Sequence, residues 1–571
     1  MRTRDFMRWI TALMLVMIVI PASAQYGSRG DQRYRDRYGR SNTYGDVVNL
    51  RLDNPGTLEE MMPADMKERV RLLHIEGPLD SRDFAYLKKL CNRSRCVDRE
   101  NHKIDNYIDL ELENANILSA SSNVRSNSSR SERDVLGDAL SGSHHLRSIV
   151  LPQNLKQIGD RALKNCGELE EVIMPPGVRS LGNEAFSNCT RLEYIKLRQD
   201  LERIGEECFY DCSNLQGIGL PHSLTEIGNR AFMGSGIKEV VLPDRLRSLG
   251  SCAFEGTPLT LLEIPAATRI VDNKIGMMKN LREIRVADGN EYYSVSDGVL
   301  YDGRGSMLLF CPVARTGALT VPDGVTQIAE YALSGTAISS VSLPRTLREI
   351  GSHAFSECSK LSYVDMGPSV QTIGESAFEN CSSLAAISLP NDMKKIAPLA
   401  FKKCTSLASV TLPAHLTEIG KEAFEKCSSL MSIDLPYSLT TISERAFKDC
   451  TGLTRVVVPD ACTWVKKEAF LRCTGLMMID LGNGLQRLGE HALQETAITQ
   501  LVIPASVTRI DKEVTKKCSN LNRIECHAVN PPSLDKVSNE KIPLYVPASA
   551  IEAYKKAKNW KKFNKNIHPL Y

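Results

Sequence analysis

The sequence contains few features that point to catalysis. Its 10 histidines are scattered, and the pair His144-His145 has no chelating partner nearby. No nucleophile elbow, paired-carboxylate signal, His-Glu-x-x-His segment or phosphate-binding loop occurs in the chain. Such groups must converge before they can hold a metal, a cofactor or a reacting atom. We therefore expect no enzyme activity, no metal site and no cofactor.

The chain also lacks a large excess of charge. Its formal net charge is +3 over 571 residues. A balance this even gives the whole protein no strong attraction to nucleic acid or to an anionic membrane. We expect no nucleic-acid partner.

Long apolar runs are nearly absent. The one clear run, Trp9 to Ile20, is too short to span a bilayer comfortably. It lies between a basic start and Ala22-Ser23-Ala24, which predicts a signal peptide over residues 1–24. We expect an exported protein, at the cell surface or secreted, with no transmembrane segment after cleavage. No cysteine precedes Cys91, so a lipid anchor just after the signal is excluded and a periplasmic location is the alternative.

Aromatic residues are modest in number at 6%, whereas leucine, isoleucine and valine recur with a period of 23 residues, sometimes 22. The repeat reads Leu-x-x-Ile-x-Leu-Pro-x-x-Leu-x-x-Ile-Gly-x-x-Ala-Phe-x-x-Cys-x-x, with clear copies from Leu384 and Leu407. A period of this length indicates a solenoid in which each repeat is one coil. We predict a mainly β stack of about 17 coils.

Three repeat positions carry physical information. The Gly position holds Ala329, Ala397 and Ser443 in other coils, which indicates a tight site for a small residue more than an obligatory positive φ. The Phe position should form a buried aromatic column. The Cys position holds ten cysteines, but serine or threonine replaces them in other coils, and neither can form a disulfide. We therefore predict buried free thiols that cap backbone carbonyls.

Two other cysteines, Cys91 and Cys96, lie five residues apart before the repeats. In an exported protein this pair is a possible disulfide, and the sequence leaves the alternative of two free thiols open.

The composition divides the chain into further segments. Residues 25–45 are an Arg- and Tyr-rich stretch that we interpret as a disordered tether. Residues 46–134 form an N-terminal cap region and a Ser-rich loop, residues 135–528 the solenoid, and residues 529–571 a C-terminal cap. An insertion at about residues 290–316 predicts a β-hairpin that protrudes from the solenoid.

Local patterns predict elements in the two caps. We expect helices over Met66 to Leu73 and Asp83 to Leu90, and a strand within Ile104 to Ile117. In the C-terminal cap we expect a strand at Leu544 to Val546 and a short helix over Ser549 to Lys558, with Trp560 and Phe563 packed on the last coil.

With these residues in view, the chain resembles the BspA-like leucine-rich-repeat family of bacterial surface proteins, also called the Treponema pallidum type. The repeat itself carries the resemblance, and Asp297 to Tyr301 and Asn530-Pro531-Pro532 are similar to segments of that family. The resemblance implies a right-handed solenoid with β-strands lining one face. It also implies adhesion to host matrix, to other bacteria or to host cells, and no shared catalytic residues.

Outward strand positions should form rows across coils, and such rows are where a solenoid binds. We interpret them as a candidate face for protein or glycan partners on a monomer, with a solvated sheet surface as the alternative. The candidate residues are Tyr363, Asp365, Ser388, Thr411, Asp434, Arg455 and Asp480.

Two basic segments have alternative interpretations. Arg29-Gly30-Asp31 resembles the tripeptide that integrins recognise, although an Arg-, Gly- and Asp-rich stretch produces it easily by chance. The surrounding tether could bind anionic polymers through charge and stacking, or be a plain linker. The lysines near the C-terminus are expected to be the solvated face of a capping helix.

Overall fold

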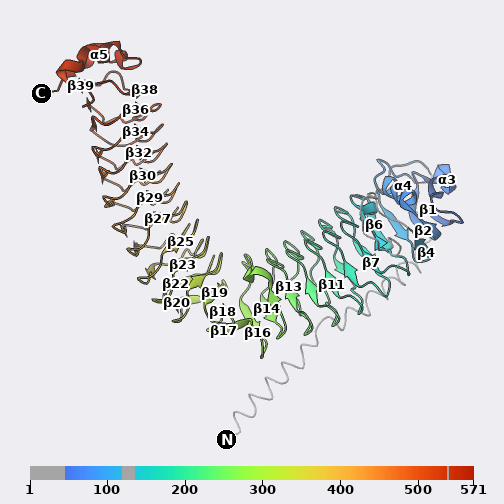
Figure 1. Ribbon diagram of the computed structural model, residues 1–571. Coiled ribbons are helices and arrows are strands. Elements are labelled where there is room, and N and C mark those ends of the chain that lie inside the picture. Colours follow the sequence, from blue (N-terminus) through green and yellow to red (C-terminus); the bar gives the residue numbers. More distant parts are fainter. Residues whose placement is uncertain (1–45, 99, 119–134, 537–538, 571) are drawn as a thin grey trace, which may run out of the picture. The chain divides into compact units, whose positions relative to one another are not determined.

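The computed structural model describes residues 46–98, 100–118, 135–536 and 539–570 (Figure 1). The chain divides into two compact units, residues 1–278 and 279–571. The predicted signal peptide, the tether and most of the Ser-rich loop lie outside the described residues. Both units are stacks of short parallel strands, as the repeat predicts, so the mainly β solenoid is confirmed.

The first unit begins with a cap that extends the ladder of the coils. Its strands β1, β2 and β3 pair in parallel, β3 pairs in turn with β6 (Leu146–Val150) of the first coil, and helix α4 packs beside them. The helix predicted over Asp83 to Leu90 is confirmed as α4, and its N-terminus is capped by Asp80, which accepts from the Arg82 backbone N–H at 2.9 Å. The cap elements are β1 (Asp46–Arg51), α3 (Leu58–Met61), η1 (Ala64–Met66), β2 (Val70–Leu79), α4 (Ser81–Cys91), β3 (Ile108–Glu111) and β4 (Ala115–Ile117).

The helix predicted over Met66 to Leu73 is wrong. Only a 3₁₀ turn ends at Met66, and Val70 begins β2. Val70 and Leu73 are fully buried there, and β2 pairs with both β1 and β3. Two ladders of backbone hydrogen bonds outweigh a weak local helical pattern.

The coils of the first unit contribute short strands to two ladders. One ladder consists of β6 (Leu146–Val150), β8 (Glu171–Ile173) and β10 (Tyr194–Ile195). The other consists of β5 (Val135–Leu136), β7 (Gln157–Ile158), β9 (Ser180–Leu181), β11 (Arg203–Ile204), β12 (Glu226–Ile227), β13 (Ser248–Leu249) and β15 (Arg269–Ile270). Outside these ladders lie η2 (Asp138–Leu140), β14 (Leu261–Ile264) and η3 (Val271–Asn273).

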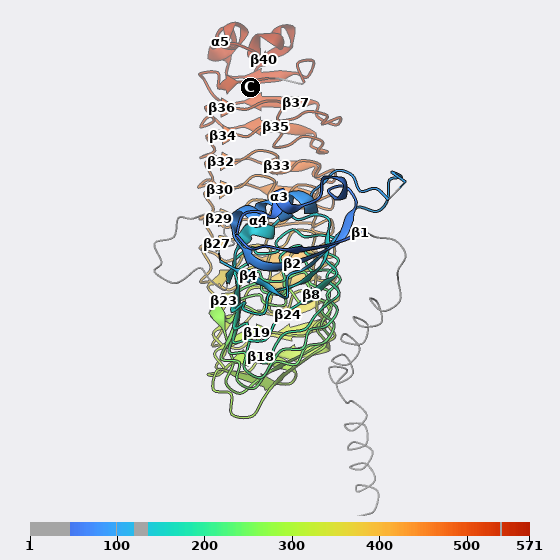
Figure 2. The same cartoon turned by 90° about the vertical axis from the view of Figure 1, so that its right-hand side faces the viewer.

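The second unit repeats this plan, and Figure 2 shows its two ladders as separate columns. The strands on the Leu-x-x-Ile-x-Leu side, which we call the strand face, are β20 (Thr316–Thr320), β22 (Ala337–Ser342), β24 (Tyr363–Asp365), β26 (Ala386–Ser388), β28 (Ser409–Thr411), β31 (Arg455–Val457), β33 (Met478–Asp480), β35 (Gln500–Ile503) and β37 (Arg523–Cys526). The second ladder is β21 (Gln327–Ile328), β23 (Glu349–Ile350), β25 (Thr372–Ile373), β27 (Lys395–Ile396), β29 (Glu418–Ile419), β30 (Thr441–Ile442), β32 (Trp464–Val465), β34 (Arg487–Leu488), β36 (Arg509–Ile510) and β38 (Ser533–Leu534).

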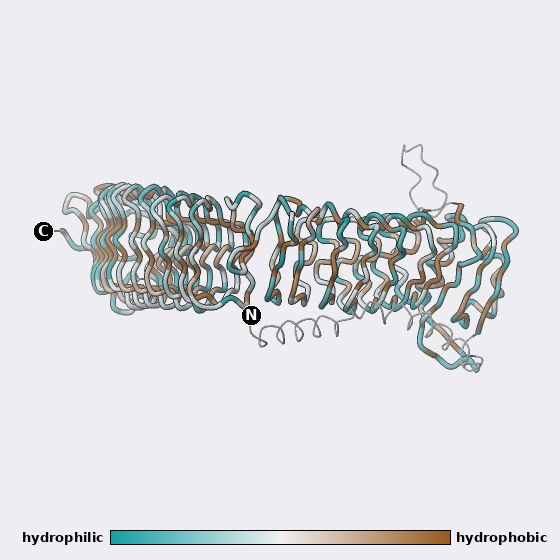
Figure 3. Tube along the Cα trace, turned by 90° about the horizontal axis from the view of Figure 1, so that it is seen from below, coloured by the Kyte–Doolittle hydropathy of each residue, from teal (hydrophilic) through white to brown (hydrophobic). Residues whose placement is uncertain are grey.

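Pairing between coils places like residues on like residues. Val341 pairs with Val364 on the strand face, and Ile350 pairs with Ile373 on the second ladder. All four side chains point inward and are buried. The hydrophobic segments therefore recur at the same height from coil to coil within each unit (Figure 3).

The predicted aromatic column is confirmed in both units. In the second unit consecutive rings from Phe355 to Phe470 stack with centroids 4.9–5.5 Å apart and interplanar angles of 3–8°. In the first unit Phe186 to Phe254 stack at 5.2–5.4 Å. All these rings are buried, so each of these coils adds one ring to the core of its unit.

The repeated glycine is a packing site, as predicted. Gly374 has no positive φ, and a Cβ built on it would lie 2.4 Å from the Ser352 backbone nitrogen of the preceding coil. The left-handed residues come two and six positions later, at Ser376 (φ 53°) and Asn380 (φ 61°). No residue type marks these positions in the repeat, because many different residues occupy them in other coils.

The cysteines of the repeat cap backbone carbonyls of the preceding coil. Cys404 Sγ donates to the Phe378 carbonyl at 3.1 Å, and the other repeat cysteines make equivalent bonds. Threonine caps a carbonyl of its own coil instead, as Thr496 does with Leu493 at 2.9 Å. The serine copies differ, because the buried hydroxyl of Ser235 has no partner among the described residues.

The possible disulfide between Cys91 and Cys96 is not formed, because both residues are free thiols. Cys91 ends α4 and lies fully buried close to Cys166, and burial raises its pKa to about 12. Cys96 instead accepts from Arg93 Nη2 at 3.2 Å. The sulfur of Cys96 is therefore engaged with Arg93 and not with Cys91.

The predicted hairpin forms but does not protrude. Strands β17 (Tyr293–Ser296), β18 (Val299–Asp302) and β19 (Met307–Phe310) are antiparallel, and β19 pairs in parallel with the first coil strand, β21. Val299 and Leu308 are fully buried in the core that runs through the second unit. The insertion therefore caps that stack, and β16 (Glu283–Val286) precedes it.

The C-terminal cap forms as predicted. Strands β39 (Leu544–Val546) and β40 (Ile567–Pro569) continue the strand-face ladder, and α5 (Ile551–Lys556) covers the end with η4 (Ala548–Ala550), η5 (Trp560–Lys562) and η6 (Asn564–Asn566). Trp560 and Phe563 are 2% exposed. The Trp560 Nε1–H donates to the Pro532 carbonyl at 2.7 Å, which fixes the cap on the last turns.

Counting free thiols tests whether the cysteines are reduced and buried. All 17 cysteines are free, and Cys252 is the one that is half-buried while the others are buried. Because burial raises thiol pKa values, for example to about 12 at Cys404, little reactive thiolate forms at neutral pH. Titration with a thiol reagent should detect at most Cys252 in the native protein and all 17 cysteines in denaturant without reductant. A count two lower in denaturant would indicate that a disulfide exists.

Candidate functional site

The structure brings the predicted candidate residues together on one face. Tyr363 and Asp365 lie on β24, and their positions continue coil by coil through β26, β28, β31 and β33. The register pairs Ser340 with Tyr363, Ser388 with Thr411, and Arg455 with Met478. Successive residues of one row are therefore about 4.8 Å apart along the stack. All seven candidate residues are exposed.

One part of this face differs from the rest. From Ala385 to Thr411 its exposed side chains are alanine, serine and threonine, whereas the next three coils carry large apolar ones. Four of them are 44–64% exposed, and we call them the methionine patch: Met431, Val457, Met477 and Met478. Exposed apolar side chains that gather in neighbouring coils are the kind of surface that marks an interaction site.

Charged residues border the methionine patch without internal partners. Arg455 lies within it, and Asp434 and Asp480 occupy the row of Val457. None of the three forms an ion pair with any residue that the structure describes. Their charges are available to a ligand, in contrast to the paired charges on other sides of the coils.

The sequence identified these rows but missed the centre of the patch. Met431 and Met477 occupy the position directly after the first leucine of the repeat, which was not counted among the outward rows. That position is exposed because the chain has just left the turn and the strand begins one residue later, as at Met478. A third outward row in the repeat could have predicted it.

The tripeptide Arg29-Gly30-Asp31 lies outside the described residues, so its role stays a prediction.

A cluster of charges on another side of the second unit is fully paired. Lys402 Nζ lies 2.6 Å from Glu422 Oε2 and 3.1 Å from Glu425 Oε2. Lys448 contacts Glu425 at 3.2 Å, and Arg445 contacts Glu422 at 3.5 Å. Each charge is offset by a neighbour in the next coil, so the cluster connects coils and offers no unpaired nucleophile or base.

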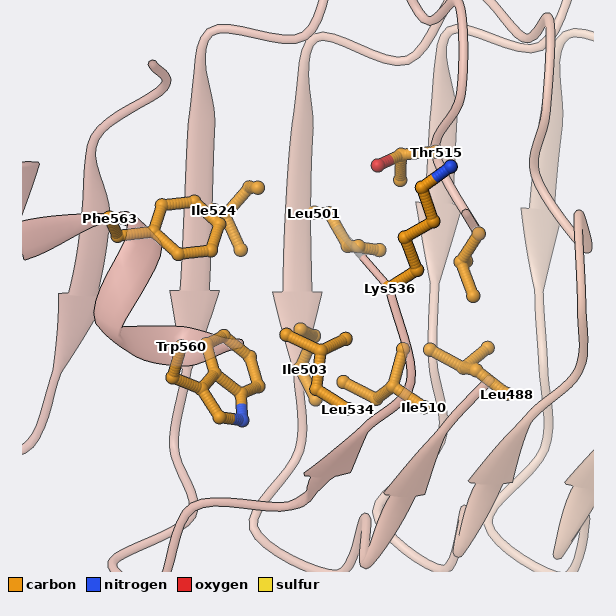
Figure 4. A pocket seen from close by; sticks show the side chains of 11 residues that line it. Leu488, Leu501, Ile503, Ile510, Thr515, Ile524, Leu534, Lys536, Trp560 and Phe563 are labelled. Atoms are coloured by element: carbon orange, nitrogen blue, oxygen red, sulfur yellow. The ribbon is translucent and has the colours of Figure 1, made fainter. Parts of the chain in front are cut away.

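The second unit contains a small cavity beneath the C-terminal cap (Figure 4). Its volume is about 40 Å³ and most of its lining is apolar, including Val514, Trp560 and Phe563, with Lys536 also on its wall. Thr515 occupies the repeat position that holds phenylalanine in other coils and leucine at Leu493, and Val514 precedes it at the alanine position. The side chains of the aromatic column therefore become smaller towards the cap and leave a cavity. The volume of this cavity is far below the roughly 300 Å³ of a small-molecule site.

Among residues 46–98, 100–118, 135–536 and 539–570, no group of three or more His, Cys, Asp or Glu side chains is arranged to hold a metal ion. Within the same part of the chain, no helix has the length and apolar character needed to cross a bilayer.

Comparison with known proteins identifies the family. A model of the BspA-type leucine-rich repeat region, built of 6 copies, matches residues 135–260, 202–296, 309–406 and 394–522. These segments cover more than half of the chain, so the protein belongs to the BspA-type leucine-rich-repeat family. The fold of this family is typically non-catalytic and suited to protein interaction.

The solved structures to which this chain is similar include leucine-rich-repeat proteins from bacteria. A leucine-rich repeat protein from Eubacterium ventriosum is 21% identical over 56% of this chain and 82% of its own, with a TM-score of 0.48. A leucine-rich cell surface protein from Faecalibacterium prausnitzii is 23% identical over 68% of this chain and 92% of its own, with a TM-score of 0.46. The T. pallidum leucine-rich repeat protein is 28% identical over 36% of this chain and 85% of its own, with a TM-score of 0.25. No curated protein matches the chain.

The ionic cluster predicts a pH dependence. Burial opposes ionisation of Glu422, but hydrogen bonds and charges from Lys402 and its neighbours prevail and lower its pKa from 4.5 to about 2. A depressed carboxyl pKa stabilises the fold above the unfolded-state value and loses that contribution as the pH falls through the folded-state value. Between about pH 5 and about pH 2 the protein should lose on the order of 1–3 kcal/mol through this group. Urea unfolding of Glu422→Gln should show a shallower decline over this range, and an unchanged decline would contradict the assignment.

The cavity predicts a stabilising substitution. Val514→Leu should fill part of it and raise the free energy of unfolding by about 0.5–1 kcal/mol, since cavity volume costs about 24 cal/mol per Å³. The matched control is Val456→Leu, where Val456 is 1% exposed inside a well-packed coil. There the extra methylene should destabilise the protein by about 1–3 kcal/mol. Equal effects of the two variants in urea unfolding would show that the cavity is filled or collapsed in solution.

Proposed function

We propose that this protein is an exported binding protein, at the cell surface or secreted, that engages host or bacterial macromolecules through the strand face of its second unit. Three features support the proposal: the predicted signal peptide, membership in the BspA-type family and the absence of a recognisable catalytic constellation in the sequence. The partner is a protein or a glycan, and the protein acts as a monomer.

The observation that carries the proposal is the methionine patch with its unpaired charges. Methionine and arginine are enriched in the centres of protein interfaces, and methionine adapts its shape to different partners. A solvated sheet surface would tolerate the small residues found from Ala385 to Thr411 in every coil. The patch instead exposes Met477 and Met478 side by side at more than half of their surface, which favours a protein over a glycan as the partner.

A periplasmic scaffold that holds envelope proteins is the second candidate. The leucine-rich-repeat fold, which is suited to protein interaction, supports this role as well. The same face would then bind an envelope protein.

Location is tested first. Intact producing cells are treated with protease and the chain is detected afterwards, with a periplasmic protein as control. Loss of the chain while the control survives supports the surface location. Protection of the chain contradicts the adhesin and favours the scaffold.

Binding is tested with charge-introducing variants of the strand face. Met477→Asp combined with Met478→Asp should weaken binding to the responsive member of a panel of purified host-matrix proteins and bacterial cells by about tenfold or more. The control pair, Gln371→Asp with Thr372→Asp, adds the same charge to exposed residues near and on the second ladder. Equal losses in both pairs would place the binding surface elsewhere.

A further inference from the structure

The C-terminal cap concentrates positive charge. Residues 548–570 contain six lysines and one acidic residue, Glu552, so this segment carries +5 while the whole chain carries only +3. All six lysines are exposed. We call them the lysine cap, and they lie on and around α5 at the red end of Figure 1: Lys555, Lys556, Lys558, Lys561, Lys562 and Lys565.

Buried aromatic residues hold these lysines in place. Tyr554, Trp560 and Phe563 alternate with them along the chain and are at most 2% exposed. The Tyr554 and Trp560 rings meet edge to face at 5.1 Å, and the Tyr554 hydroxyl donates to the Ala528 carbonyl at 2.7 Å. Because the aromatic side chains point into the cap, the lysines between them point outward from a fixed framework.

The charges of the lysine cap lack partners within the protein. Only Lys555 forms an ion pair, with Glu552 at 2.9 Å, and the other five have none among the described residues. In the coils before the cap the pattern is different. Ten of the twelve lysines from Lys395 to Lys536 lie within 4.0 Å of a carboxylate.

We propose that the lysine cap binds an anionic polysaccharide. A cluster of unpaired ammonium groups attracts polyanions through charge, and lysine acts as a point charge that suits sulfate and carboxylate groups on a flexible chain. The lysines are separated by short intervals along α5, η5 and η6, so their charges are distributed over this surface. A polymer with repeated anionic groups can contact several of them at once.

The composition of the cap disfavours two other polyanions. An amphipathic membrane anchor exposes large apolar side chains, whereas Tyr554, Trp560 and Phe563 are buried and none of the exposed large hydrophobic residues lies within residues 548–570. Single-stranded nucleic acid is bound through exposed aromatic or arginine side chains on which bases stack, and residues 548–570 contain no arginine. The site is separate from the strand face, so either can fail without the other.

The test uses the intact protein and heparin as the probe, with neutral dextran as the blank. Lys558→Gln, Lys561→Gln and Lys562→Gln together should weaken heparin binding by about tenfold or more at about 50 mM salt, and should flatten the salt dependence by roughly one unit of slope for each ammonium group removed. The matched control makes the same change in net charge at Lys279, Lys360 and Lys394, which are exposed in the same unit and form no ion pair with described residues. Control and wild type should bind alike.

Two further measurements keep the test decisive. The corresponding triple Lys→Arg variant preserves charge and should retain binding, and thermal unfolding checks that the glutamine variant is folded. Equal losses in the cap and control variants, or absence of heparin binding at low salt, would overturn the proposal. Tighter, cap-dependent binding to vesicles of phosphatidylcholine and phosphatidylglycerol than to heparin would also overturn it and identify a membrane surface as the ligand.

Discussion

The parallel hydrogen bonding between successive coils is the constraint on which the rest of this structure depends. It repeats every backbone position at one strand spacing, so each residue lies on its counterpart in the next coil. Isolated aromatic pairs favour offset or edge-to-face arrangements. Here the rings stack nearly parallel, with interplanar angles of 3–8°, because the backbone ladder fixes their separation and orientation.

The same constraint decides the chemistry of the cysteines and of the charges. Stacked thiols could approach one another, but each donates to a carbonyl of the preceding coil, as Cys381 does with Phe355 at 3.1 Å. Stacked like charges would repel, and acidic and basic residues therefore alternate between coils, as at Arg445 and Glu468. The strand face has no comparable requirement, since its outward side chains contact only solvent and one another. Variation is tolerated there, which is where a ligand can be selected.

The repeat predicted the stack, the aromatic column and the carbonyl-capping thiols because each rests on a residue type that recurs with the period. The repeat did not predict features that depend on residues outside its 23-residue period. Val299 and Leu308 predicted a hairpin correctly, but only the packing of the first coil of the second unit shows that they cap it. The candidate rows were predicted from alternation along the strands. Two residues of the methionine patch, Met431 and Met477, are exposed outside those rows. That third exposed row lies one residue before the strand begins, so alternation within the strand does not include it.

A solenoid must also protect its terminal strand, and lysine is a common means of preventing edge-to-edge pairing. Strand β40 is the last strand of its ladder, so one or two lysines near it would serve that purpose. Edge protection does not explain five lysines without a carboxylate partner, because their mutual repulsion destabilises the cap and a paired lysine protects an edge equally well. Most lysines from Lys395 to Lys536 are paired, which shows that this sequence commonly supplies carboxylates where charge only has to be solvated. The excess at the cap is therefore best explained by an anion that the protein does not itself provide.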